Sequence, residues 1–187
     1  MELYPYALLL HIIGVLGLFI AMSLELIIVA RLRGAQTTTQ MREWMAISHV
    51  IGTVLPISAI LILASGLFMA LTTWGWNQAW IDLSLGILVI LGILSPVING
   101  PRMKAIQRAM EDAQDGPVPA SLRKLTIDPV LQAYTLLPAI MALGAVALMV
   151  IKPDWLGSTV VMIIALGVGL IAGQLSLKAS RRIRVAM

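Results

Sequence analysis

The sequence contains no cysteine, which excludes disulfides, thiolate metal sites, iron–sulfur clusters and haem attached covalently through a CxxCH motif. Charged residues are also scarce. They make up 12% of the 187 residues, whereas a soluble domain carries about 25%. Hydrophobic residues make up 59%. A soluble fold of this length needs polar surface that this chain does not have, so the composition indicates an integral membrane protein whose main partner is the lipid bilayer.

The formal net charge of +4 does not indicate nucleic acid. Nucleic-acid-binding domains gather their basic residues on one folded face. Here the basic residues stand between apolar runs, as they do in the cytoplasmic loops of membrane proteins. We therefore expect no nucleic-acid partner.

Five apolar segments are long enough to cross a bilayer, which takes about 20 residues at about 1.5 Å each for a core of about 30 Å. We predict an all-α fold, a polytopic bundle of five transmembrane helices in a single transmembrane domain over residues 1–187. The tryptophans of residues 72–80 predict an interfacial turn, and Asn99-Gly100-Pro101 predicts a helix stop. The predicted spans are residues 6–30, 45–72, 81–98, 129–151 and 155–177, with a cytoplasmic loop over residues 101–128.

Basic residues predict the orientation through the positive-inside rule. Twelve of the 13 lysines and arginines fall in the first loop, the third loop or the C-terminal tail, and Lys152 alone falls on the other side. We therefore predict that the N-terminus is outside and the C-terminus is cytoplasmic. The first span does not read as a cleavable signal peptide, because residues 1–4 are acidic rather than basic and the apolar run is too long.

The third loop is predicted to carry a short amphipathic helix over residues 102–114, lying on the membrane surface. Residues 115–119, Asp-Gly-Pro-Val-Pro, are expected to end it. A charged helix of this kind is more often a solvated connector than a docking site for a partner.

The ionisable residues in or beside the predicted spans are His11, Glu25 and His49, with Asp82 and Asp128 closer to the interfaces. Such residues are costly in a bilayer and are therefore candidates for function. His11 and Glu25 share a stripe with Gly14 and Gly17, which predicts that this stripe faces the bundle interior. A histidine in a membrane serves as a haem or chlorophyll ligand, a proton-relay group or a packing residue, and these alternatives stay open for both histidines as cofactor-binding candidates.

Depth argues against one haem held between both histidines. His11 lies about five residues inside one end of its span and His49 about five residues inside the opposite end, so their depths differ by more than ~10 Å. Two axial nitrogens on one iron are only about 4 Å apart. Glu25 shares the depth of His49, so we predict that these two form an ion pair or part of a proton path.

His11 is also the candidate metal ligand, and a methionine is a candidate for the sixth position of a haem iron. Met69, Met149 and Met162 are the candidates for that position. Methionine is abundant here, with 11 residues, and in apolar helices it more often fills gaps in the packing.

The fifth span carries Ala165, Gly169 and Gly173 at four-residue spacing. Small residues at this spacing let helices approach closely. They predict packing either within the bundle or against another subunit, in a homo-oligomer or with other membrane subunits.

Four short motifs resemble an uncharacterised bacterial family of predicted integral membrane proteins. They are Leu10-His11-Ile12-Ile13-Gly14, Gly66-Leu67 before Trp74-Gly75-Trp76, Gly100-Pro101-Arg102, and Met149-Val150-Ile151-Lys152-Pro153. The family is similar in layout to the copper-resistance D type and to the membrane-bound protoporphyrinogen oxidase of the J type, over about residues 3–153. In the oxidase-like relatives a first-span histidine binds haem, and His11 matches that position. Their further ligand, a lysine on a later span, has no counterpart here, so the resemblance implies haem binding rather than oxidase activity.

The sequence therefore favours a protein of the bacterial cytoplasmic (inner) membrane that binds haem b, or another tetrapyrrole, through His11 for electron transfer or cofactor handling. A non-catalytic accessory subunit of a larger membrane complex is the alternative. Small-solute transport is a weaker one, because few polar groups line a path. No complete set of catalytic residues is recognisable, so the sequence predicts no reaction.

Overall fold

The computed structural model describes residues 2–185, and their side chains except those of residues 132–133 and 177–185. Its elements are helical. They are α1 (Tyr4–Gly34), α2 (Thr38–Met69), the π-helical turn η1 (Ala70–Trp74), α3 (Ala79–Glu111), α4 (Ala120–Thr126), α5 (Pro129–Ile151) and α6 (Trp155–Val185). Five helical segments in the described part of the chain are long and apolar enough to span a membrane. The predicted all-α fold with five candidate spans is confirmed.

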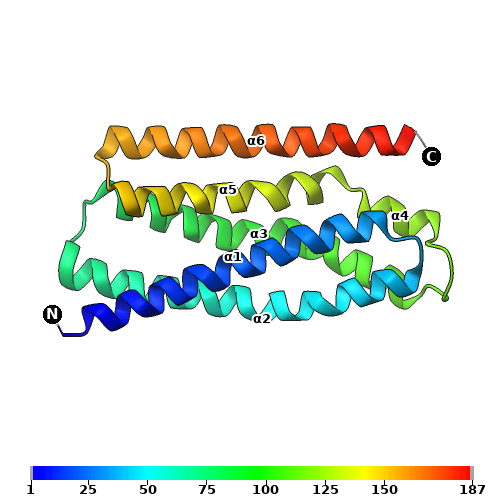
Figure 1. The fold of residues 1–187 in the computed structure, drawn as a ribbon, viewed down its shortest axis with the longest axis horizontal. Coiled ribbons are helices and arrows are strands. Elements are labelled where there is room, and N and C mark those ends of the chain that lie inside the picture. Colours follow the sequence, from blue (N-terminus) through cyan, green and yellow to red (C-terminus); the bar gives the residue numbers. More distant parts are fainter. Residues whose placement is uncertain (1, 186–187) are drawn as a thin grey trace.

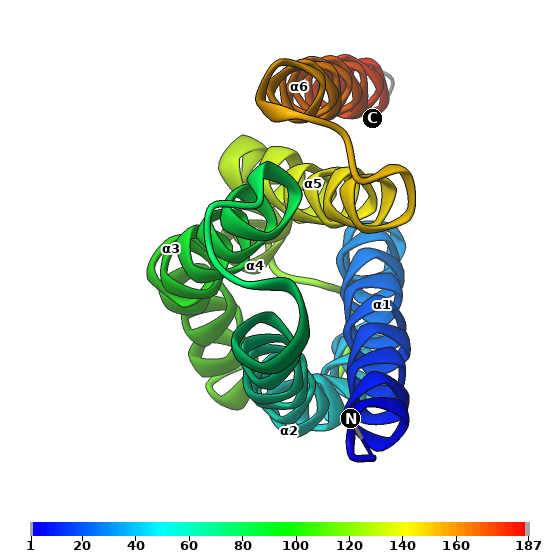
Figure 2. The same ribbon diagram turned by 90° about the vertical axis from the view of Figure 1, so that its left-hand side faces the viewer.

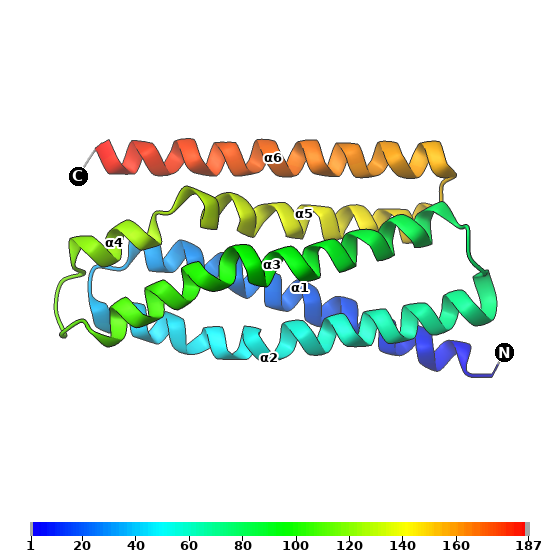
Figure 3. The ribbon, with the colours of Figure 1, turned by 180° about the vertical axis from the view of Figure 1, so that it is seen from behind.

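The long helices run side by side along the longest axis of the molecule (Figure 1). The turn at η1 and the connection between α5 and α6 lie together at one end, which we call the tryptophan end. The connection between α1 and α2 and the segment around α4 lie at the other, which we call the loop end (Figure 3). α1 begins at the tryptophan end and α6 ends at the loop end, as five crossings require. Which end faces the cytoplasm stays a prediction from the basic residues.

Seen end-on, α1, α2, α3 and α5 surround the centre of the bundle, and α6 packs outside it on α5 (Figure 2). α1 packs mainly against α2, and α5 against α6, whereas α2–α3 and α1–α5 contacts are sparse. The close approach of α1 to α2 depends on glycine, because a Cβ added at Gly14 would lie 3.1 Å from the backbone nitrogen of Ile62. His11, Gly14 and Ala21 are buried, which confirms that this stripe of α1 faces inward.

A hydrophobic cluster closes the loop end. It joins residues of α1, α2, α3, α4 and α5, namely Ile28, Val29, Leu32, Met41, Met45, Ile106, Met110, Leu122 and Leu131. Two ion pairs hold the polar segments around it, Arg42 with Asp115 and Arg102 with Asp128. The segment between α3 and α5 is therefore packed onto the bundle.

The predicted helix stop at residues 99–101 is wrong, and so is the separate surface helix over residues 102–114. α3 continues through Pro101 to Glu111. Proline inside a helix removes one backbone donor, so Pro101 costs the helix the bond to the carbonyl of Val97, four residues earlier. One residue further along, the Arg102 guanidinium donates to the carbonyl of Ile98. Further along, Ile106 and Met110 are buried in the cluster at the loop end, and this packing stabilises the continued helix.

Candidate functional site

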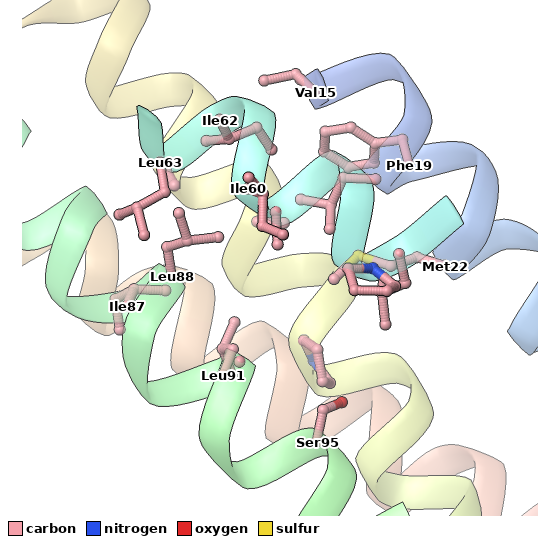
Figure 4. Close-up of a pocket in the computed structure, with 18 of the residues that line it drawn as sticks. Val15, Phe19, Met22, Ile60, Ile62, Leu63, Ile87, Leu88, Leu91 and Ser95 are labelled. Carbon is pink, nitrogen blue, oxygen red and sulfur yellow. The ribbon is translucent and has the colours of Figure 1, made fainter. Parts of the chain in front are cut away.

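A cavity of about 860 Å³ lies between α1, α2, α3 and α5. Its middle part is apolar, with side chains from three helices (Figure 4). They are Val15, Phe19 and Met22 of α1, Ile60, Ile62 and Leu63 of α2, and Ile87, Leu88 and Leu91 of α3, with Ser95 further along α3. The volume falls within the roughly 300–1,000 Å³ of small-molecule and cofactor sites. Its polar groups gather toward the two ends of the bundle.

His11 lines the cavity in its half near the tryptophan end, and its side chain is oriented by α2. Its Nδ1 lies 3.2 Å from the backbone oxygen of Ile62 and 3.2 Å from Oγ of Ser65. Because a carbonyl only accepts, a hydrogen bond to Ile62 requires the proton on Nδ1. Nε2 then keeps its lone pair, and it has no hydrogen-bond partner among the described residues. Histidines that bind metals are commonly held in this way, with the second nitrogen donating to a carbonyl.

Gly66 makes room for the His11 ring. A Cβ added at Gly66 would lie 3.2 Å from Cε1 and 3.4 Å from Nδ1 of His11. These contacts are tighter than ordinary van der Waals distance, so a larger residue would press on the imidazole. The glycine of the motif Gly66-Leu67 is thus explained by the space that the His11 ring needs.

His49 lies outside this cavity. Its side chain is exposed, and it is not among the residues that line the cavity. The structure therefore brings it neither to His11 nor to Glu25. Residues at one depth on neighbouring helices meet only when they also face each other, and the sequence supplied the depth alone.

Glu25 has a different partner, on α3. Nδ2 of Asn99 donates a hydrogen bond of 3.1 Å to Oε1 of Glu25, and both residues line the cavity in its half near the loop end. Tyr134 of α5 is a further buried residue with a polar atom. Oδ1 of Asn99 and the hydroxyl of Tyr134 are buried with no hydrogen-bond partner among the described residues. Neither Asn99 nor Tyr134 was predicted as a site residue. For Asn99, an amide at the end of an apolar run could have indicated a polar contact inside the bundle.

A lysine and two tryptophans line the cavity at the tryptophan end. Nζ of Lys152 lies 4.0 Å from the ring centroid of Trp74 and 5.4 Å from that of Trp80. The two indoles meet edge to face, with centroids 5.4 Å apart. Lys152 ends α5 in the left-handed conformation at φ 50°. In the sequence, Lys152 indicated only the topology, because its contacts with the two tryptophans depend on the fold.

Two of the three candidate methionines share the cavity with His11. Met69 and Met149 line it. Met162 instead packs between α5 and α6, where a Cβ added at Gly144 would lie 3.4 Å from its sulfur. It is therefore not available to a centre at His11.

The small-residue face of α6 is covered by α5 of the same chain. A Cβ added at Gly144 would lie 2.8 Å from Cβ of Ala165, and one added at Gly169 would lie 2.6 Å from Cδ1 of Leu137. Gly173 is buried and lines a small pocket with Tyr134. Of the two predicted uses of this face, the structure shows packing within the bundle.

No group of three or more His, Cys, Asp or Glu side chains that could hold a metal ion occurs among the described residues. A metal centre at His11 would therefore have to take its remaining ligands from a cofactor or from softer donors. A macrocycle supplies four nitrogens itself, so one protein ligand is a sufficient anchor for it.

The helices and their internal cavity define a class, the integral membrane helical bundle. The chain belongs to the family described as "Predicted integral membrane protein (DUF2269)", whose model matches residues 5–153. The protein is thus an integral, multi-pass membrane protein. No curated protein and no solved structure matches the chain. The matched range holds every residue that lines the cavity except Tyr4, and it ends before α6.

Proposed function

We propose that this protein binds haem b, or a similar tetrapyrrole, in the cavity between α1, α2, α3 and α5, where Nε2 of His11 would hold the iron. Its role is electron transfer or cofactor handling in the cytoplasmic membrane of a bacterium. The observation that carries the proposal is the state of His11. Its Nδ1 is held by α2, and its side chain lines an apolar cavity of about 860 Å³.

The residues around His11 fit such a group. The cavity lining is mostly apolar, which suits the body of a macrocycle. Met69 and Met149 line the same cavity, and either would offer a thioether to the iron, a ligand type that raises the reduction potential of haem iron. When bound, the haem supplies reversible one-electron chemistry.

The tryptophan end suits the carboxylates that a b-type haem carries. Lys152 lines the cavity beside Trp74 and Trp80. An ammonium binds carboxylates through charge-assisted hydrogen bonds. Under the orientation predicted from the basic residues, the haem and Lys152 would lie nearer the outer face of the membrane.

The absorption spectrum of the protein purified in detergent, after expression with full haem supply, tests this proposal. We expect a Soret band in the wild type and in His49→Ala, because His49 is exposed and lies outside the cavity. We expect His11→Ala to lose the band. A colourless wild type, or a full band in His11→Ala, would contradict the proposal. A colourless protein that co-purifies with other subunits at fixed stoichiometry would instead support an accessory subunit.

A further inference from the structure

We infer that Glu25 and Asn99 form a proton-binding site inside the membrane-spanning bundle, in which Glu25 carries the proton and Asn99 accepts its hydrogen bond. The two residues come from α1 and α3. The site lies 14 residues from His11 along α1, about 21 Å at the helical rise of about 1.5 Å per residue. It does not depend on the haem proposal.

The geometry of the amide carries this inference. A protonated carboxyl has an O–H donor and an acceptor oxygen, and a primary amide has N–H donors and an acceptor oxygen, so the two groups can pair through two hydrogen bonds. One of the two is present, from Nδ2 of Asn99 to Oε1 of Glu25 at 3.1 Å. Oδ1 of the same amide is buried without a partner. Because Oδ1 only accepts, it is satisfied when the carboxyl of Glu25 carries a hydrogen, and an ionised carboxylate leaves it unpaired.

Charge leads to the same conclusion. A carboxylate inside a bilayer is costly unless it is paired or neutralised. Glu25 takes part in neither the Arg42–Asp115 nor the Arg102–Asp128 ion pair. Asn99, its hydrogen-bond donor, carries no charge and is 5% exposed. A proton on Glu25 removes the charge and completes the pairing with Asn99 at once.

The other ionisable groups around the site leave this assignment intact. On α3, Lys104 lines the same cavity, and Arg102 is paired with Asp128 at 3.0 Å. On α2, His49 is exposed. On α4, Arg123 donates to the carbonyl of Ala35. Two lysines line the cavity, Lys104 on α3 five residues after Asn99 and Lys152 at the tryptophan end. Lys104 is therefore the cation whose charge would most affect the proton on Glu25.

Infrared spectroscopy of the full chain in lipid nanodiscs tests the site. We expect a carboxylic-acid C=O stretching band at neutral pH in the wild type, absent from Glu25→Gln and shifted in frequency in Asn99→Leu. Glu111→Gln is the matched control, because Glu111 is exposed, and it should keep the band. A wild type without the band, or a band that survives in Glu25→Gln, would overturn the inference.

An apolar carbodiimide, which reacts with protonated carboxyl groups in apolar surroundings, provides the second measurement. Mass spectrometry should find Glu25 labelled, with less labelling as the pH rises. Protection by Na⁺ but not by K⁺ at constant pH would show a sodium site and overturn the proton assignment. Glu25→Gln should elute from size exclusion as the wild type does. It should also keep any Soret band, so failure of this inference is distinguishable from failure of the haem proposal.

Discussion

Asn99 of α3 donates a hydrogen bond of 3.1 Å to the carboxyl group of Glu25 on α1. The two helices lie across the bundle from each other (Figure 2). Both residues line the cavity between the helices, and the hydrogen bond links α1 to α3 there. An amide and a carboxyl group that meet in this way fix the relative rotation of two helices, which apolar packing alone leaves adjustable.

Removing one partner of this pair should destabilise the protein more than removing both. Asn99→Leu leaves the buried carboxyl of Glu25 without its donor and should lower the free energy of unfolding by about 1–3 kcal/mol. In the double variant Glu25→Leu/Asn99→Leu, both partners are apolar, and much of that stability should return. Thermal unfolding in detergent of the wild type, the two single variants and the double variant measures this double-mutant cycle. Additive losses would show that the two side chains do not interact.

The contact between α1 and α2 should be sensitive to a single methyl group. A Cβ at Gly14 would lie 2.9 Å from Cγ1 and 3.1 Å from the backbone nitrogen of Ile62, so Gly14→Ala should destabilise the bundle by about 1–3 kcal/mol. Gly86→Ala is the control, because nothing lies within 4 Å of its added Cβ. It should stabilise α3 by about 0.8–1 kcal/mol through helix propensity. Equal effects in the two variants would argue against the close contact.

The packing of α6 on α5 can be tested by a disulfide, since the chain has no cysteine of its own. Cβ positions at Gly144 and Ala165 lie 2.8 Å apart, so Gly144→Cys/Ala165→Cys should cross-link within one chain after a small shift. Gly144→Cys/Gly167→Cys is the control, because nothing lies within 4 Å of a Cβ at Gly167. A cross-linked dimer on a non-reducing gel would show that this face of α6 contacts a second copy.

The predicted orientation can be tested with the same cysteine-free background. Thr73 at the tryptophan end and Gln114 at the loop end are both exposed. A membrane-impermeant maleimide should label Thr73→Cys in intact cells and label Gln114→Cys only after permeabilisation. The reverse pattern would place the basic loops outside and contradict the positive-inside assignment.

Particular residues show what the sequence could predict. The five spans were predictable because length and hydropathy alone define them, and His11 faces inward as its small neighbours on α1 indicate. The pairing of Glu25 with Asn99 was not predictable, because it depends on how α1 and α3 are rotated about their axes. The continuation of α3 past Pro101 was missed because the burial of Ile106, which stabilises it, is a tertiary effect.

The central claim, that His11 anchors a haem, is tested most directly by titrating the purified protein in detergent with haem. The account predicts saturation at one haem per chain with a Soret shift, loss of this binding in His11→Gly, and its recovery when free imidazole is added to that variant. His49→Gly should titrate as the wild type does, because its side chain is exposed outside the cavity. Equal haem binding by the wild type and His11→Gly, with no response to imidazole, would contradict the account.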